Sequence, residues 1–180
     1  MIVAMAGLPG AGKSTLARAL APRLAAVVLD KDRIRDSLFG PLHVDYNREQ
    51  DDFCVDVMYR TTRWLVHRDP ATVVILDGRN YAHADQIATL RQMAADLDEP
   101  LRVIECRCDG EMALARIEED RAAGRHPAAN RDAALYRKLQ AAADPISQPK
   151  LVIDTGRPVA DCVADCLAHL RRPRSGAPRV

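Results

Sequence analysis

The stretch Gly7-Leu-Pro-Gly-Ala-Gly-Lys-Ser14 decides the fold. It satisfies the pattern G-x-x-x-x-G-K-[ST], follows the hydrophobic run at residues 2–6 and leads into the helix-forming residues 15–20. Glycines here permit backbone angles that are closed to other residues, so that successive N–H groups can converge on a phosphate. A strand before the pattern and a helix after it are the context that it requires. We therefore interpret the stretch as a phosphate-binding loop for ATP or GTP.

The polar positions of this loop each have an expected role. Lys13 places a point charge near the β- and γ-phosphates, and the Ser14 hydroxyl can ligate Mg²⁺. The alternative is a glycine-rich turn with an incidental lysine, but the chain has only four lysines among its 26 basic residues. No guanine-recognition motif is present, which favours ATP. The expected nucleotide-binding residues of the loop are Gly7, Gly10, Ala11, Gly12, Lys13, Ser14 and Thr15.

Apolar runs alternate with helix-period segments along the chain, which is typical of βαβ units. The runs are almost wholly apolar, as in strands that are covered on both faces. We predict an α/β protein with the three-layer P-loop NTPase fold: a five-stranded parallel sheet with helices on both faces and an Arg-rich lid. We expect one domain at residues 1–172 and a disordered tail at 173–180. The predicted strands are 2–6, 26–29, 72–76, 101–106 and 151–153, and the helices 13–24, 47–67, 83–97, 111–123, 131–142 and 159–170.

The charge balance limits the classes of partner. The chain has 26 Lys and Arg against 25 Asp and Glu, a formal charge of +1, which excludes binding through a strong overall basic field and argues against nucleic acid. No apolar run is long enough to span a bilayer, no signal peptide is recognisable, and the five cysteines lack the spacing of a secreted disulfide framework. We expect a cytoplasmic protein with reduced thiols and no membrane partner, whose oligomeric state the sequence leaves open.

The end of the second predicted strand carries a charged cluster, Asp30-Lys-Asp-Arg-Ile-Arg35. The carboxyl ends of strands are where α/β sheets bind ligands. Asp32 could accept the proton of a substrate hydroxyl, while an arginine orients the substrate or neutralises the transferred phosphoryl group. The alternative is a plain helix start with Asp30 as its N-cap.

The third predicted strand ends in Asp77, followed by Gly78-Arg79-Asn80. A carboxylate at the end of a hydrophobic strand beside a phosphate-binding loop can hold Mg²⁺ directly or through its water shell. Arg79 would then point into the same cleft and contact substrate. An isolated aspartate at a strand end can also be only a turn former.

Arginines near residue 120 are the expected lid. Arg116 and Arg121 lie on a predicted helix that runs into Ala-Ala-Gly-Arg-His-Pro-Ala-Ala-Asn-Arg at residues 122–131. Arginines that close over the phosphates exclude water and stabilise developing charge. The alternative is a solvated helix with ordinary Glu–Arg pairs. At the last strand, Arg157 in Thr-Gly-Arg-Pro could stack on the adenine base or simply form a turn.

The segments GLPGAGKSTLARALA and LDKDRIRDSL resemble the small P-loop kinases of the zeta-toxin, chloramphenicol-phosphotransferase and polynucleotide 5′-hydroxyl kinase group, to which adenylylsulfate kinase and gluconate kinase are related. The resemblance implies a nucleoside-monophosphate-kinase-like fold. It places the acceptor-activating aspartate on Asp32 and the arginine of D-x-x-R on Arg35. Lid arginines fall on Arg116, Arg121 and Arg125. The acceptor motifs of the two related kinases are not recognisable between Phe39 and Arg79.

The sequence therefore predicts an ATP- and Mg²⁺-dependent kinase that transfers the γ-phosphoryl group to a hydroxyl of a small molecule. Its expected catalytic residues are Lys13, Asp32, Arg35, Arg116, Arg121 and Arg125, with Asp32, Arg35 and Arg79 on the substrate and Ser14 and Asp77 on the metal. One alternative is a polynucleotide 5′-hydroxyl kinase, which the seven acids and four bases of residues 30–52 disfavour. The other is a nucleotide-binding ATPase or switch that has no acceptor.

Overall fold

A computed structural model describes residues 1–124 and 132–171, which form an all-parallel sheet with strand order β2-β3-β1-β4-β5. The predicted α/β fold with a five-stranded parallel sheet is thereby confirmed. The described residues exclude residues 125–131, which include Arg125, and the expected tail at 173–180. The strands are β1 (Ile2–Ala6), β2 (Val27–Asp30), β3 (Val74–Asp77), β4 (Leu101–Arg107) and β5 (Lys150–Asp154).

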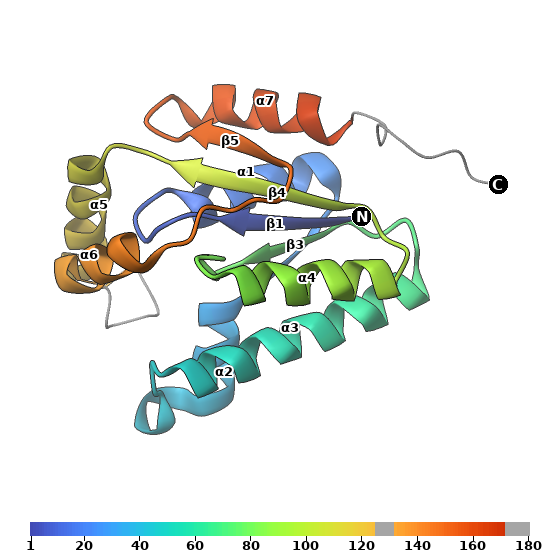
Figure 1. The fold of residues 1–180 in the computed structure, drawn as a ribbon, viewed down its shortest axis with the longest axis horizontal. Helices are drawn as coiled ribbons and strands as arrows, with labels where there is room; N and C mark the ends of the chain where they lie inside the picture. Colours follow the sequence, from blue (N-terminus) through green and yellow to red (C-terminus); the bar gives the residue numbers. More distant parts are fainter. Residues whose placement is uncertain (125–131, 172–180) are drawn as a thin grey trace.

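Helices cover both faces of the sheet (Figure 1). Helices α1 and α7 lie on one face and α3 and α4 on the other, whereas α5 and α6 lie beyond the carboxyl ends of the strands (Figure 1). The helices of the described residues are α1 (Lys13–Leu24), α2 (Lys31–His43), α3 (Arg48–Arg68), α4 (Ala84–Asp96), α5 (Gly110–Ala122), α6 (Ala133–Ala142) and α7 (Val159–Leu170).

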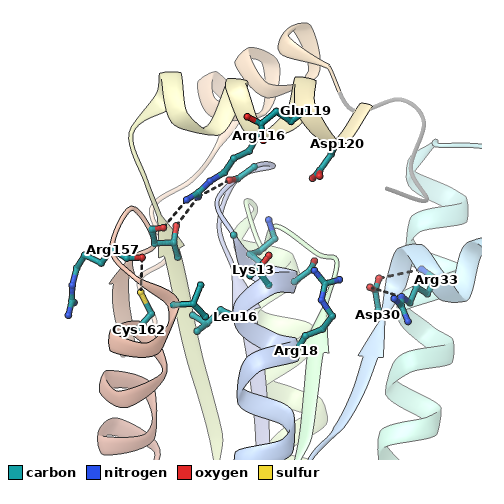
Figure 2. Close-up of a pocket in the computed structure, with 16 residues that line it drawn as sticks. Lys13, Leu16, Arg18, Asp30, Arg33, Arg116, Glu119, Asp120, Arg157 and Cys162 are labelled. Carbon is teal, nitrogen blue, oxygen red and sulfur yellow. Dashed lines mark hydrogen bonds and ion pairs between the residues drawn. The ribbon is translucent and has the colours of Figure 1, made fainter. Parts of the chain in front are cut away.

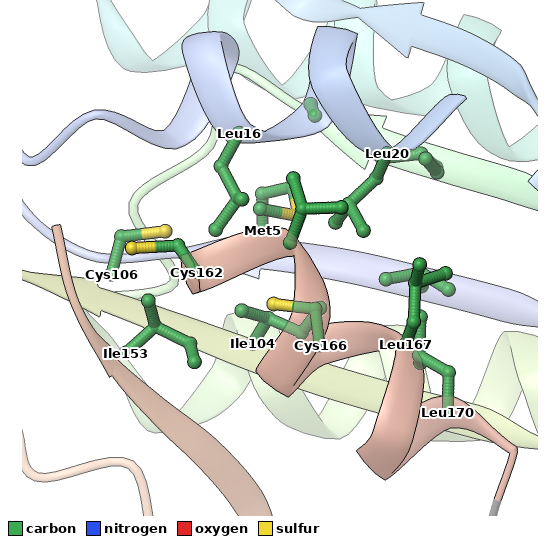
Figure 3. Packing of buried hydrophobic residues seen from close by; sticks show 14 of the residues in the cluster. Met5, Leu16, Leu20, Ile104, Cys106, Ile153, Cys162, Cys166, Leu167 and Leu170 are labelled. Atoms are coloured by element: carbon green, nitrogen blue, oxygen red, sulfur yellow. The ribbon is translucent and has the colours of Figure 1, made fainter. Parts of the chain in front are cut away.

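The core explains why the strands are apolar at every position. In β1, Val3 and Met5 pack with α1 and α7, as Figure 3 shows for Met5. Ile2 and Ala4 pack with α3 and α4 on the opposite face. All five residues of this strand are buried, so a polar side chain at any of them would lose its hydration. Burial on both faces fixes β1 as a central strand, with the phosphate-binding loop at its carboxyl end.

Helix α2 is not among the six predicted helices, although a helix start with Asp30 as its N-cap was the alternative interpretation of this segment. It begins because the side chain of Asp30 accepts hydrogen bonds from the backbone N–H groups of Asp32, at 3.0 Å, and Arg33, at 3.3 Å. The helix is interrupted at Gly40, whose φ of 58° is not helical, just before Pro41. The buried residues of the helix are Lys31, Asp32 and Arg35, so its segment has no apolar periodicity that would indicate a helix.

The described residues contain no helix long and apolar enough to cross a membrane. All five cysteines are free thiols. Burial raises the pKa of the Cys106 thiol to about 12, which is consistent with its place in the core rather than with reactivity (Figure 3).

Candidate active site

The phosphate-binding loop packs directly against its neighbours. Gly7 has a φ of 126° and Gly10 a φ of 74°, both outside the range that L-residues favour. A Cβ at Gly7 would lie 2.3 Å from the carbonyl oxygen of Cys106, and one at Gly10 would lie 2.4 Å from that of Ala113. The glycines therefore serve close packing against β4 and α5 as well as loop geometry.

A cavity of about 580 Å³ opens beside this loop and α1 (Figure 2). We call it the nucleotide pocket; its volume is typical of small-molecule sites. Most residues expected to bind nucleotide line it, whereas Gly7 and Ala11 line a different cavity on the other side of the loop. The expected residues that the structure brings together here are Gly10, Gly12, Lys13, Ser14, Thr15, Arg116 and Arg157.

Lys13 lies at the centre of the loop. Its Nζ donates to the carbonyl oxygens of Gly7 and Leu8, at 2.7 Å each, and only 4% of the residue is exposed. These contacts hold the ammonium group against the first residues of the loop. A bound phosphate would add a charged acceptor to this arrangement.

Asp77 and Ser14 form a pair that fits Mg²⁺. Asp77 is 1% exposed, and burial raises the pKa of its carboxyl, while a hydrogen bond with Ser14 and the charge of Lys13 act in the opposite direction. Its Oδ1 has no hydrogen-bond partner among the residues that the structure describes. A buried carboxylate oxygen without a donor, beside a hydroxyl, is a donor set of the kind that Mg²⁺ uses together with water and nucleotide phosphates.

The two aspartates of the charged cluster line different cavities. Asp30 lines the nucleotide pocket and caps α2. Its Oδ2 lies 3.8 Å from Nε of Arg33 (Figure 2). Asp32 instead lines a separate cavity of about 320 Å³, which we call the second cleft. Its walls include Pro9 of the loop, Lys31, Asp32 and Arg35 of α2, Arg79, and Lys138 of α6.

Arg35 holds Asp32 in place. Its NH1 donates to Oδ1 of Asp32 at 3.1 Å, its NH2 contacts Oδ1 of Asp51, and its guanidinium lies 5.3 Å from the ring centroid of Tyr46. Only 3% of the Arg35 side chain is exposed. Lys31 completes the network, with Nζ 3.4 Å from Asp32 and 2.7 Å from Asp51. Arg35, which we expected to contact substrate, is thus engaged mainly with the two carboxylates.

Arg79 lies in the second cleft, as the sequence predicts for a substrate residue. Its NH2 donates to Oδ1 of Asp52 at 2.7 Å, and 13% of its side chain is exposed. Asp52 also lies 3.5 Å from Arg48. The loop after β3 therefore contributes a cation to the same cavity as Asp32.

Arg116 reaches the phosphate-binding loop from α5 (Figure 2), and Thr155 holds it there. The NH2 of Arg116 donates to the carbonyl oxygen of Thr155 at 2.9 Å, and NH1 lies 3.4 Å from both Thr155 Oγ1 and the carbonyl oxygen of Gly10. Thr155 Oγ1 also lies 3.0 Å from the carbonyl oxygens of Ala11 and Arg107. The sequence analysis missed Thr155 because a threonine after a strand matches no motif.

Two other expected arginines are placed elsewhere. Arg121 pairs with Glu118 on its own helix, at 2.8 Å, and lines neither the nucleotide pocket nor the second cleft. Arg157 lines the nucleotide pocket, but its guanidinium points away from Lys13 and pairs with Asp165 of α7, at 2.8 Å (Figure 2). Of the expected lid arginines in the described residues, only Arg116 contacts the loop.

The sheet order, the glycine-rich loop and the two flanking cavities define a small P-loop kinase-like α/β protein. A family model described as an AAA domain (AAA_33) matches residues 2–145, and the chain belongs to this family. No curated protein matches the sequence.

Solved structures share the fold at low sequence identity. A candidate kinase from Chloroflexus aurantiacus J-10-fl has a TM-score of 0.75 at 23% identity, with 94% of this chain and 98% of that chain covered. The APS kinase CysC of Mycobacterium tuberculosis, in complex with AMPPNP and APS, has a TM-score of 0.70 at 19% identity, with 95% and 97% covered. A gluconokinase from Sinorhizobium meliloti 1021 has a TM-score of 0.66 at 15% identity, with 93% and 90% covered.

Proposed function

We propose that this protein is an ATP- and Mg²⁺-dependent kinase that phosphorylates a hydroxyl group of a small molecule. One observation carries the proposal: neighbouring residues at the tip of the phosphate-binding loop line two different cavities. Gly10 lines the nucleotide pocket, and the adjacent Pro9 lines the second cleft, which contains Asp32. A γ-phosphate at this tip would lie between the nucleotide and a carboxylate that is 5% exposed.

In the proposed reaction, Asp32 accepts the proton of the acceptor hydroxyl. The acceptor oxygen forms a bond to the γ-phosphorus, the bond from that phosphorus to the β–γ bridging oxygen breaks, and ADP leaves with the electron pair. Lys13 and Arg116 stabilise the negative charge on the phosphoryl oxygens. Ser14 and Asp77 would hold Mg²⁺, which would supply further neutralisation of phosphate charge.

Arg35 and Lys31 serve this reaction by orienting Asp32. Two cations near a carboxylate favour its ionised form, which is the form that accepts a proton. Because Arg35 also binds Asp51, its guanidinium is fixed from two sides. In our proposal Arg35 is therefore a positioning residue, not a substrate ligand.

The geometry favours a small acceptor over a polynucleotide. The second cleft has a volume of about 320 Å³, whereas a strand needs an open, basic groove. The names of APS kinase and gluconokinase denote small-molecule acceptors, which supports the same choice. A switch without an acceptor needs a carboxylate for Mg²⁺, the role of Asp77, but gives no reason for a second buried carboxylate, Asp32, in the second cleft.

The test is a screen of hydroxyl-containing metabolites for acceptor-stimulated release of ADP. We expect at least one compound to stimulate release by the wild-type protein and none to do so with Lys13→Ala, which serves as the blank. Slow ATP hydrolysis that no compound accelerates would support the switch instead. Stimulation by a 5′-hydroxyl oligonucleotide that weakens steeply with salt would support the polynucleotide kinase.

A further inference from the structure

Charge is distributed unevenly along the second cleft. Where α2 and α3 line it, Lys31 and Arg35 pair with Asp32 and Asp51, so that two cations are balanced by two carboxylates. This part of the cleft holds its own counter-charges. A ligand needs no net charge to bind there.

The lining that comes from the β3–α4 loop and from α6 differs. It contributes the cations Arg79 and Lys138, and among the described lining residues the carboxylate that pairs with Arg79 is Asp52. Arg48 also lines the cleft, but it is 71% exposed and its shortest contact is with Asp85, at 2.7 Å. The lining as a whole carries five cations against three carboxylates, 5 − 3 = +2, with histidine neutral.

Arg79 is suited to bind an anion. A guanidinium has five N–H donors, and among the described residues the one hydrogen bond of Arg79 is from NH2 to Asp52. With 13% of its side chain exposed, the group is largely shielded from water, which strengthens its interaction with an anion. Arginine can also bind a carboxylate or phosphate group through two parallel hydrogen bonds.

The N-terminus of α4 also borders the cleft, although Asp144 accepts a hydrogen bond from its Ala84 N–H at 3.4 Å and Asp85 lies in its first turn. His83, its N-cap, and Gln86 in its first turn both line the second cleft, so that this end of the helix borders the cavity. His83 makes no capping hydrogen bond, and its Nδ1 lies 3.9 Å from Asp144. The N-terminal end of a helix carries a partial positive charge.

We propose that the acceptor carries an anionic group in addition to its reacting hydroxyl, and that Arg79 and Lys138 bind this group while the hydroxyl faces Asp32. Acceptors of this class are small hydroxy acids and phosphorylated or sulfated alcohols, which all combine a hydroxyl with an anionic group. This inference rests on the proposed function, because it names the class of acceptor. It also predicts a binding site that is measurable without any turnover.

The test uses sulfate as the probe and the protein saturated with AMPPNP and Mg²⁺, so that the phosphate-binding loop is occupied. Sulfate is titrated and followed by NMR chemical-shift changes. We expect saturable binding that weakens roughly tenfold in Arg79→Gln and in Lys138→Gln, the loss typical of one hydrogen bond to a charged group. The control is Arg91→Gln, an exposed arginine of α4 outside the second cleft, which should bind sulfate as the wild type does.

Two results of this titration would overturn the inference: no saturable sulfate binding to the loaded protein, or binding that is unchanged in both variants. Each variant must retain its affinity for AMPPNP, which shows that it is folded. The proposed function is tested separately by ADP release with matched pairs such as gluconate with glucitol and glycerate with glycerol. Stimulation by neutral members alone would leave the kinase proposal standing and remove the anionic acceptor.

Discussion

Asp30 and Asp32 are two residues apart, yet the fold gives them different surroundings. Asp30 caps α2 and lines the nucleotide pocket, whereas Asp32 lines the second cleft within a network of two cations. From the sequence, this cluster could provide either a helix N-cap or a general base. The structure separates the two roles: Asp30 is the N-cap, and Asp32 is the candidate base. The capping hydrogen bonds of Asp30 fix where α2 begins, and this places Asp32 in the cleft.

Thr155 provides a prediction at the residue scale. Thr155→Val keeps the side-chain shape but removes the hydroxyl that contacts the phosphate-binding loop and Arg116. We expect the affinity for AMPPNP, measured by calorimetry, to fall roughly five- to tenfold, the loss of about one hydrogen bond. Thr155→Ser restores the hydroxyl and should stay within about twofold of the wild type. Equal affinities for the Val and Ser variants would show that the hydroxyl plays no part.

Asp77 provides a prediction about pH. Burial raises the pKa of its carboxyl above the usual value of 3.8, so the folded state holds this proton more tightly than the unfolded state does. The contribution of Asp77 to stability is therefore fully present below the unfolded pKa and is lost as pH rises through the folded pKa.

We expect the unfolding free energy of the wild type, relative to Asp77→Asn, to fall as pH rises from about 4 to about 7 in the absence of Mg²⁺. Urea denaturation of the two proteins at several pH values measures this difference. A difference that rises with pH would mean that the ionised carboxylate is stabilised in the fold, contrary to the burial argument.

At the scale of elements, the sequence predicts most of the fold. The predicted strands and the six predicted helices begin and end within two residues of the observed ones, because each buries apolar residues, in the sheet, against it or, for α5 and α6, in a cluster of their own. Helix α2 was missed because its buried residues are Lys31, Asp32 and Arg35, so its inner face is polar. Periodicity of apolar residues cannot detect a helix that is held by ion pairs.

The sequence also predicts some contacts of the site and misses others. The motif gives Lys13 and Ser14 because a fixed spacing positions both on one loop. Contacts between distant elements, such as that of Arg116 with Thr155, follow only from how α5 packs against the sheet. The sequence assigned Arg121 the same role as Arg116, but the helix directs it to Glu118 instead.

The polar inner face of α2 leads to a prediction about stability. Arg35→Met leaves Asp32 buried with less compensation, and breaking a buried ion pair typically costs about 3–5 kcal/mol. Arg33→Met on the same helix is the matched control: its side chain is 69% exposed and lies 3.8 Å from Asp30, so we expect a loss below about 1 kcal/mol. Urea unfolding compares the two. Similar losses in both variants would refute a structural role for Arg35.

At the scale of the whole molecule, the phosphate-binding loop connects several elements. It joins β1 to α1 and packs against β4 and α5. A ligand at the loop should therefore stabilise the complete fold. AMPPNP with Mg²⁺ at about 100 times its dissociation constant should add about 2.7 kcal/mol, which raises the melting temperature by roughly 5–10 °C.

Removal of Mg²⁺ with a chelator should reduce this thermal shift, because Ser14 and Asp77 then contribute no metal contact to the complex. Lys13→Ala should lose most of the shift. If Lys13→Ala melts with the same ligand-induced shift as the wild type, AMPPNP binds somewhere other than the loop.

The most direct test of the central claim, that Asp32 activates an acceptor hydroxyl beside a nucleotide bound at the loop, is Asp32→Asn assayed with an acceptor from the screen. We predict that acceptor-dependent ADP release falls at least about 100-fold, the lower range for loss of a general base, while the affinity for AMPPNP changes less than about twofold. Asp36→Asn, at an exposed carboxylate of the same helix, should retain full activity. Undiminished turnover in Asp32→Asn would contradict the account and remove Asp32 from the mechanism.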